Sequence, residues 1–130
     1  MNSYLHRLAR QGEIDWLSYY FAEFICSFDD SDIDSTLGQS AVMVSEASLA
    51  GNVCVDLSEF SNQPLFPAAT LEGIAQSQGP ETGYWRSQLQ TSKCVGGPGE
   101  HCPLILDDTR LYMNRFWYYE DFVATRIRTM

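Results

Sequence analysis

Basic residues are scarce in this chain of 130 residues, which carries eight Lys and Arg against 17 Asp and Glu and a formal net charge of −9. Binding to the phosphates of DNA relies on Lys and Arg, so this balance argues against a sequence-independent grip on DNA. Long apolar runs are also missing, and none approaches the roughly 18 consecutive residues that span a bilayer. The N-terminus lacks the apolar stretch of a signal peptide. We therefore expect a soluble, cytoplasmic protein without a membrane partner.

Residues of the usual catalytic and phosphate-binding motifs are few. The histidines are His6 and His101, and neither lies beside a Ser or Cys in a recognisable nucleophile motif. Gly96 to Gly99 resembles the start of a phosphate-binding loop, but Glu100 to Pro103 follows where Gly-Lys-Ser/Thr would bind phosphate and Mg²⁺. The glycine run therefore predicts a flexible loop. We expect no catalytic residue, cofactor or metal ion in this chain.

The chain has four cysteines, which are Cys26, Cys54, Cys94 and Cys102. Cys26 and Cys54 lie inside apolar segments and are interpreted as small core residues. Cys94, His101 and Cys102, with Cys54 as a fourth ligand, could form a zinc site and even a zinc hydrolase. Their spacing matches none of the usual paired-ligand patterns, so independent free thiols and a loop histidine are the favoured interpretation.

Apolar and aromatic residues make up 45% and 13% of the chain, which suits a single core in one domain over residues 1–130. Helical spacing predicts a helix from Ile14 to Phe28. Its expected apolar face contains Ile14, Leu17, Phe21, Phe24, Ile25 and Phe28, widened by Trp16, Tyr19 and Tyr20. A shorter amphipathic helix from Tyr4 to Arg10 precedes it, and Gly12 is a natural break.

A third helix is predicted from about Ser35 to Ala50. A side-chain oxygen of Asp32, Asp34 or Ser35 can cap its first turn, and Gly51 suits its C-terminal end. One face of this helix is expected to hold Leu37, Ala41, Val44 and Ser48.

The second half of the chain predicts short strands among further helices. Val53 to Leu57 is expected to be a strand, and a β-hairpin is expected from Leu104 to Leu106 and from Arg110 to Met113, around the turn residues 107–109. Helices are expected near 69–76, at 84–92 with Trp85 and Leu89 on one side, and from 119 to the end. These elements predict an α+β, mainly helical domain with a small antiparallel hairpin, and a winged-helix arrangement is possible.

An acidic cluster lies between the second and third predicted helices, at Asp29, Asp30, Asp32 and Asp34. Solvated surface is the favoured interpretation of such a charge cluster. The alternative is an acidic DNA mimic, whose carboxylates would copy the charge of phosphates and inhibit a nucleic-acid enzyme. The acidic residues are otherwise scattered along the chain, which weakens that alternative.

Aromatic residues and arginines are interleaved near the C-terminus. The aromatic members are Tyr112, Phe116, Trp117, Tyr118, Tyr119 and Phe122. Such residues can stack on single-stranded bases, anchor a protein interface, or close a core against the helix at 14–28. We expect core packing to account for most of them and one or two exposed rings to meet a partner. The candidate partner-binding residues are Arg110, Tyr112, Arg115, Trp117, Tyr118 and Tyr119.

Two segments resemble the RecD family, the helicase alpha subunit of exodeoxyribonuclease V. Gly51 to Ser58 is similar to the family's G-H-V-C-L-x-L-S segment. Pro103 to Glu120 is similar to P-L-[IV]-L-x-x-x-R-L-Y-L-x-R-[YFM]-W-x-x-E. Between them, Trp85, Leu89, Ser92 and Val95 fit the family spacing, and Val123-Ala124 fits the continuation. The turn at 107–109 departs from the family, where a Gly is frequent.

The resemblance implies the N-terminal domain of a subunit that is a 5′-to-3′ DNA helicase in double-strand-break repair. It implies a docking module that joins this subunit to the gamma (RecC-type) and beta (RecB-type) subunits. ATP and Mg²⁺ would then bind to ATPase domains that follow in the family, with DNA reached only through the assembled complex. Because no helicase motif lies between Met1 and Met130, the resemblance carries over no catalytic residue, and we expect an excised domain or a naturally short relative.

Trp117 separates the core interpretation of the aromatic segment from the interface interpretation. If Trp117 is a core residue, Trp117→Ala should cost about 3–5 kcal/mol of unfolding free energy. If it is an interface residue, the same substitution should cost much less unfolding free energy. Thermal melts of both proteins measure the difference, and equal melting temperatures would contradict the core assignment.

Overall fold

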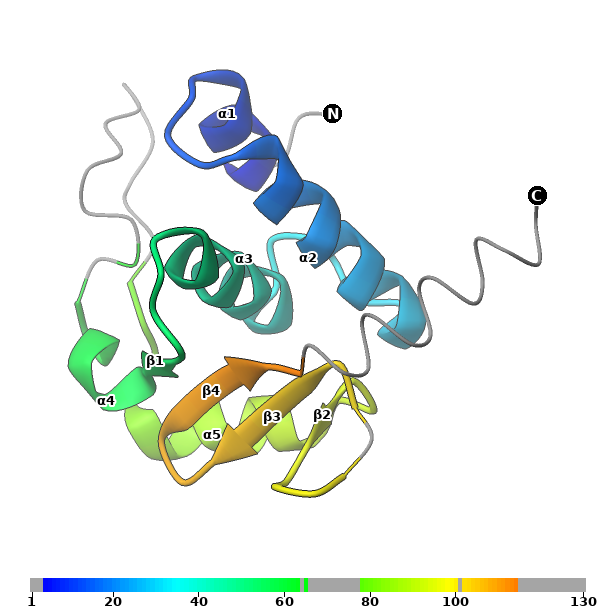
Figure 1. Cartoon of the computed structure of the whole chain (residues 1–130), viewed down its shortest axis with the longest axis vertical. Coiled ribbons are helices and arrows are strands. Elements are labelled where there is room, and N and C mark those ends of the chain that lie inside the picture. Colours follow the sequence, from blue (N-terminus) through cyan, green and yellow to red (C-terminus); the bar gives the residue numbers. More distant parts are fainter. Residues whose placement is uncertain (1–3, 64, 66–77, 101, 115–130) are drawn as a thin grey trace.

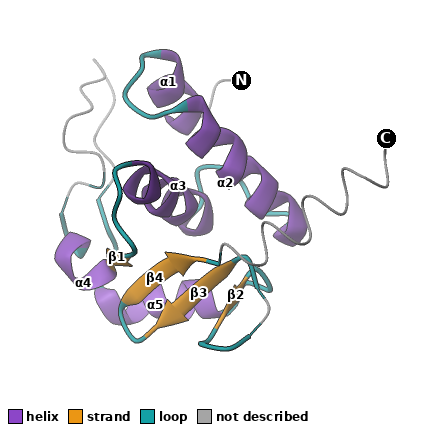
Figure 2. Ribbon diagram, viewed as in Figure 1, coloured by secondary structure: helices purple, strands orange, loops and turns teal. Residues whose placement is uncertain are grey.

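The computed structural model of the chain describes residues 4–63, 65, 78–100 and 102–114 (Figure 1). Its helices are α1 (Tyr4–Arg10), α2 (Trp16–Asp29), α3 (Thr36–Leu49), α4 (Leu57–Phe60) and α5 (Thr82–Gln90). Its strands are β1 (Val55–Asp56), β2 (Val95–Gly96), β3 (Leu104–Asp107) and β4 (Arg110–Met113). The predicted α+β, mainly helical fold is confirmed, and Figure 2 shows the strands gathered on one side of α3.

The first two helices follow the sequence prediction closely. A positive φ of 79° at Gly12 lets the chain turn between α1 and α2. Helix α2 begins at Trp16, two residues later than predicted, because the Asp15 side chain caps it by accepting a hydrogen bond from the Leu17 amide at 2.8 Å. It ends where Asp30 adopts a left-handed conformation.

Helix α3 lies at the centre of the fold, between α2 and the strands (Figure 1). Ser35 caps it by accepting from the Gly38 amide at 3.2 Å, as one of the three predicted caps. Because α2, α5, β1 and β4 all contact α3, it is buried around most of its circumference. Its buried residues are Leu37, Gly38, Ser40, Ala41, Val42, Met43, Val44 and Ser45.

Gly38 permits a close approach between the start of α3 and the preceding turn. A Cβ atom at this position would lie 1.9 Å from the carbonyl oxygen of Ile33. No side chain can occupy that space without moving the backbone, so glycine is required here by packing rather than by its own conformation.

The strands form one sheet in the order β1-β4-β3-β2. The predicted hairpin is confirmed: β3 and β4 pair antiparallel with Leu106 opposite Leu111, and Asp108 in the turn has a φ of 55°. Strand β2, which was not predicted, pairs parallel with β3, and β1 pairs antiparallel with β4. The sheet is therefore mixed.

The predicted strand from Val53 to Leu57 is wrong in its bounds. Only Val55–Asp56 is extended, and the Val53 side chain is 83% exposed. Leu57 starts α4, because the Asp56 carboxylate accepts from the Ser58 amide at 3.1 Å and caps a helix at that point.

The predicted helix at 84–92 is observed as α5, and Glu81 caps it by accepting from two backbone amides at 3.0 Å. The helices predicted near 69–76 and from 119 onward lie outside the described residues. Among the described helices, none has the length and apolar character needed to cross a membrane.

The core lies between the helices and one face of the sheet. Leu104 and Leu106 in β3 and Leu111 in β4 are buried on this face, next to Trp85 and Leu89 of α5. A single extended hydrophobic cluster joins them to α1, α2 and α3.

Trp85 connects α5 to the central helix. Its side chain is fully buried, and its indole Nε1 donates to Ser40 Oγ at 2.8 Å. The Ser40 hydroxyl in turn donates to the carbonyl of Thr36 at 2.6 Å. The indole N–H and the Ser40 hydroxyl are therefore both hydrogen-bonded, as buried polar groups require.

Removing the acceptor of this buried indole should destabilise the domain. We expect Ser40→Ala to cost about 1–3 kcal/mol of unfolding free energy, because the Trp85 N–H loses its partner without access to water. Ser87→Ala, an exposed position on α5, serves as the control and should change stability by no more than about 0.5 kcal/mol. Urea unfolding measures both.

Ser40→Ala in a Trp85→Phe background tests whether the lost indole hydrogen bond causes the destabilisation. The indole donor is then gone, so Ser40→Ala should cost less there than in the wild type. An equal cost in the two backgrounds would contradict the role assigned to the hydrogen bond.

Candidate partner-binding surfaces

The hairpin presents Arg110 and Tyr112 on the face of the sheet that points away from the core. In strand β4 the fully buried Leu111 lies between them, so the pleat directs both side chains to the opposite face. Arg110 is exposed and Tyr112 is half-buried opposite Ile105. The structure thus brings together two of the predicted partner-binding residues.

Carboxylates surround the single cation among these residues. The strand register pairs Arg110 with Asp56 on one side and with Asp107 on the other. The Tyr112 hydroxyl donates to Asp107 at 3.2 Å, and desolvation followed by this bond raises the pKa of Tyr112. Hydrogen bonds from Ser58 and Thr109, with a smaller contribution from Arg110, lower the pKa of Asp56. This charge balance makes the face a poor binder of nucleic-acid phosphates.

The other predicted partner-binding residues lie outside the described residues. These are Arg115, Trp117, Tyr118 and Tyr119. The expected packing of the aromatic segment against α2 therefore stays a prediction for them.

Sequence reasoning missed a second surface, here named the α2–α3 face and defined by Trp16, Leu17, Tyr20 and Leu49. Their side chains are 39%, 55%, 58% and 53% exposed, respectively. Trp16 and Tyr20 stack with ring centroids 5.8 Å apart. Large apolar side chains are thus presented together at the start of α2 and the end of α3.

The helical pattern of α2 explains why this surface was missed. The spacing predicts Leu17 and Phe28 on the core face, widened by Trp16 and Tyr20, yet all four are exposed. Helix α2 carries apolar residues on more of its circumference than α1 and α3 can cover, and such excess is the available signal of a second contact surface.

Two hollows flank the α2–α3 face and share Leu49 as a lining residue. The larger is an open cleft of about 690 Å³, and the smaller is a pocket of about 140 Å³. The cleft is lined by Ala9, Arg10, Gly12, Glu13, Ile14, Asp15, Trp16, Glu46, Leu49 and Ala50. The pocket is lined by Leu17, Phe21, Ser45, Ser48, Leu49 and Met113. One end of the surface is therefore acidic and the other is apolar.

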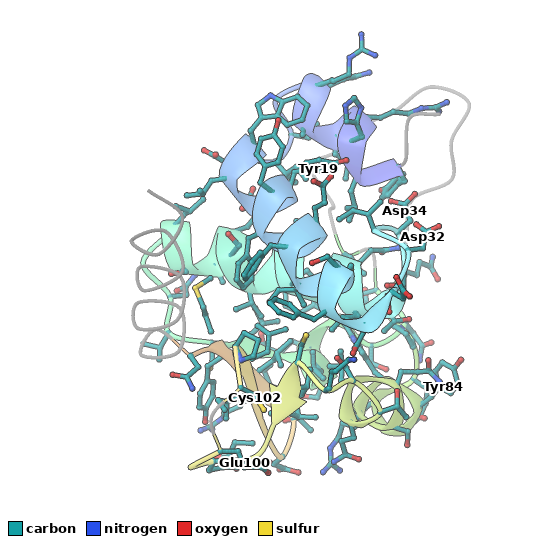
Figure 3. The ribbon with its side chains drawn as sticks, turned by 90° about the vertical axis from the view of Figure 1, so that its right-hand side faces the viewer. Tyr19, Asp32, Asp34, Tyr84, Glu100 and Cys102 are labelled. Atoms are coloured by element: carbon teal, nitrogen blue, oxygen red, sulfur yellow. The ribbon has the colours of Figure 1, made fainter. Side chains whose placement is uncertain are left out.

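The expectation that the acidic cluster is merely solvated is wrong for Asp34. Its two carboxylate oxygens accept hydrogen bonds from the backbone amides of Tyr4 at 2.8 Å and Leu5 at 3.0 Å, at the start of α1. Figure 3 shows Asp34 next to that helix, with Asp32 close by. Asp32 accepts from the Asp34 amide at 2.9 Å. The sequence predicted Asp32 and Asp34 as possible caps of α3, but Asp34 caps α1 instead and Asp32 orders the turn before α3.

Asp29 also has an internal role. It accepts hydrogen bonds from the Ser92 hydroxyl and from the Lys93 amide, the latter at 3.3 Å. The Ser92 oxygen accepts in turn from the Cys94 amide at 3.0 Å. The end of α2 is thereby tied to the segment that leads into β2.

The glycine run that begins in β2 does not form a phosphate-binding loop. The Glu100 carboxylate accepts a hydrogen bond from the Gly97 amide at 2.9 Å, where a phosphate would need the amide. A Cβ at Gly96 would lie 2.8 Å from Cys102 Sγ, so this glycine allows close packing. Figure 3 shows Glu100 and Cys102 together at one end of the molecule.

The cysteines are all free thiols, and three have raised pKa values. Burial raises the pKa of Cys26 and of Cys94 to about 11, and burial followed by the Glu100 charge raises the pKa of Cys102. Cys26 is a core residue as predicted, whereas Cys54 is only half-buried. His101 lies outside the described residues, and no group of metal-binding side chains is found within them. Raised pKa values disfavour the thiolate that catalysis or zinc binding needs.

Thiol alkylation checks this assignment. At pH 8, Cys26 and Cys94 of the folded protein should resist iodoacetamide, because their pKa of about 11 keeps them protonated and burial restricts access. Their modification should rise about tenfold per pH unit while the fold persists, as expected below the pKa. Peptide mass spectrometry gives the extent at each site, with urea-unfolded protein as the control. Rapid labelling of both residues in the folded state at pH 8 would contradict the prediction.

Comparison with known proteins agrees with the resemblance of the two sequence segments. A family model described as the RecBCD enzyme subunit RecD, N-terminal domain, matches residues 10–112. A search of curated proteins finds no match. The matched span runs from the end of α1 into β4, so it covers α2 and α3 as well as the hairpin. The chain belongs to the family of N-terminal domains of RecD, a subunit of the RecBCD enzyme.

Proposed function

We propose that this domain is a non-catalytic docking module that joins a RecD-type subunit to the gamma (RecC-type) and beta (RecB-type) subunits, chiefly the former. The family membership gives the complex, which is exodeoxyribonuclease V in DNA repair. The observation that carries the docking role is the exposure of Trp16, Leu17, Tyr20 and Leu49 on one face. Exposed apolar and aromatic residues gathered in this way are typical of protein-binding surfaces.

The chemistry of the described residues also favours docking over catalysis. The thiols with shifted pKa values are shifted away from the reactive form. The glycine loop holds its own glutamate at the Gly97 amide. On this proposal, ATP hydrolysis and DNA translocation belong to other parts of a RecD-type subunit, and this domain acts without a cofactor.

An acidic DNA mimic is the weaker candidate. Its inhibitory surface would need freely presented carboxylates on one face. Asp29 and Asp34 instead accept hydrogen bonds from other segments of the chain, and Arg110 lies between two carboxylates in the sheet register. The carboxylates of Asp29 and Asp34 therefore stabilise the fold and are not freely presented to a partner.

Co-purification tests the docking role. The tagged chain should retain the purified gamma subunit of the same source at moderate salt, because an apolar contact survives screening of surface charge. The beta subunit and an unrelated acidic domain of similar size provide comparison and control. Folded protein, judged by circular dichroism, that retains neither subunit would overturn the docking proposal.

A further inference from the structure

We propose that the α2–α3 face is the docking surface itself, and that it seats a segment of the partner subunit presenting apolar side chains and one arginine. This inference rests on the proposed docking function and adds the surface and the partner chemistry. It favours this face over the face of the sheet that carries Arg110 and Tyr112, two of the partner-binding residues predicted from the sequence.

The apolar part of the partner segment follows from the smaller hollow. Leu17 and Leu49 line this pocket and are each more than half exposed, beside the buried Phe21 and the half-buried Met113. The pocket volume of about 140 Å³ suits a single aliphatic or aromatic side chain. Exposure of a single leucine costs little free energy. A partner that covers both Leu17 and Leu49 removes a contiguous apolar area from water, which favours binding.

The arginine follows from the larger hollow. Its lining contains three acidic residues, Glu13, Asp15 and Glu46, and one basic residue, Arg10. The cleft therefore has an excess of negative charge. Glu46 already accepts from the Ser18 hydroxyl at 2.7 Å and from the Asp15 amide at 3.4 Å, and Asp15 accepts from the Leu17 amide. A carboxylate accepts about four hydrogen bonds, so both retain capacity for a further donor.

Trp16 selects arginine over lysine in this cleft. Trp16 lines the cleft together with these acidic residues, is 39% exposed, and already stacks on Tyr20 through its ring. A guanidinium group can stack on an indole while donating in pairs to carboxylates, which an ammonium group cannot do. The face thus offers an anchor pocket and an ion-pairing cleft separated by Leu49.

Affinity measurements on point variants test this surface with the full chain and the purified gamma subunit. Leu17→Lys and Glu13→Lys should each raise the dissociation constant by about tenfold or more, because the first puts a charge into the apolar pocket and the second repels the arginine in the cleft. The matched controls are Tyr84→Lys, at an exposed aromatic residue on α5, and Glu59→Lys, at an exposed acid on α4. Both should stay within about twofold of wild type. Figure 3 shows Tyr84 in the lower half of the view and Tyr19 of α2 in the upper half.

The outcomes separate this inference from the proposed function. If all four variants bind the gamma subunit as tightly as the wild type does, the surface assignment is overturned and the docking function stands. A wild-type chain that binds neither subunit would overturn both.

A cross-link identifies the occupant even where a charged variant fails to fold. A photoreactive benzophenone side chain at position 17 should cross-link to the partner subunit. Cross-links formed only between two copies of the chain, or only to residues beyond Asn114 of the same chain, would assign the face to those occupants and refute the inference.

Discussion

The hydrogen bond from Trp85 to Ser40 fixes how the two halves of this domain meet. The indole is fully buried, so α5 must approach α3 closely enough for its N–H to reach a hydroxyl 2.8 Å away. The segment before α5 is held to the same geometry: a Cβ on Gly79 would lie 2.7 Å from the indole and 2.2 Å from the Phe60 carbonyl oxygen. The sheet packs against α3 and α5, so its position also follows from this contact.

Local sequence signals predicted the elements whose stability is local. Apolar spacing and capping residues located α1, α2, α3 and α5, with Ser35 as a working cap. Alternation and turn chemistry located the hairpin. Strand β1 was predicted with the wrong bounds and β2 was not predicted, because each has only two residues and is extended only through its pairing. Strand β1 pairs with Leu111, far along the chain, and β2 pairs with Leu104 beyond the glycine run. No local pattern encodes such a partner.

The candidate surface was less predictable than the fold. Arg110 and Tyr112 were placed correctly on the hairpin, but the register that surrounds Arg110 with carboxylates is tertiary information. Leu17 fits the helical period of a core residue and is exposed, because periodicity gives the direction of a side chain and not the extent of the neighbouring element. Exposure of this kind becomes visible only when the covering helices are in place.

The capping of α1 by Asp34 makes a short helix depend on a distant turn. Helix α1 has seven residues, and so short a helix is not stable alone in water. Its first amides are bonded to a carboxylate that lies about 30 residues later, in the turn before α3. The stability of helix α1 therefore depends on that turn being folded. Since Ala9 and Arg10 of α1 line the acidic cleft, the shape of that cleft depends on a contact at the far end of the helix.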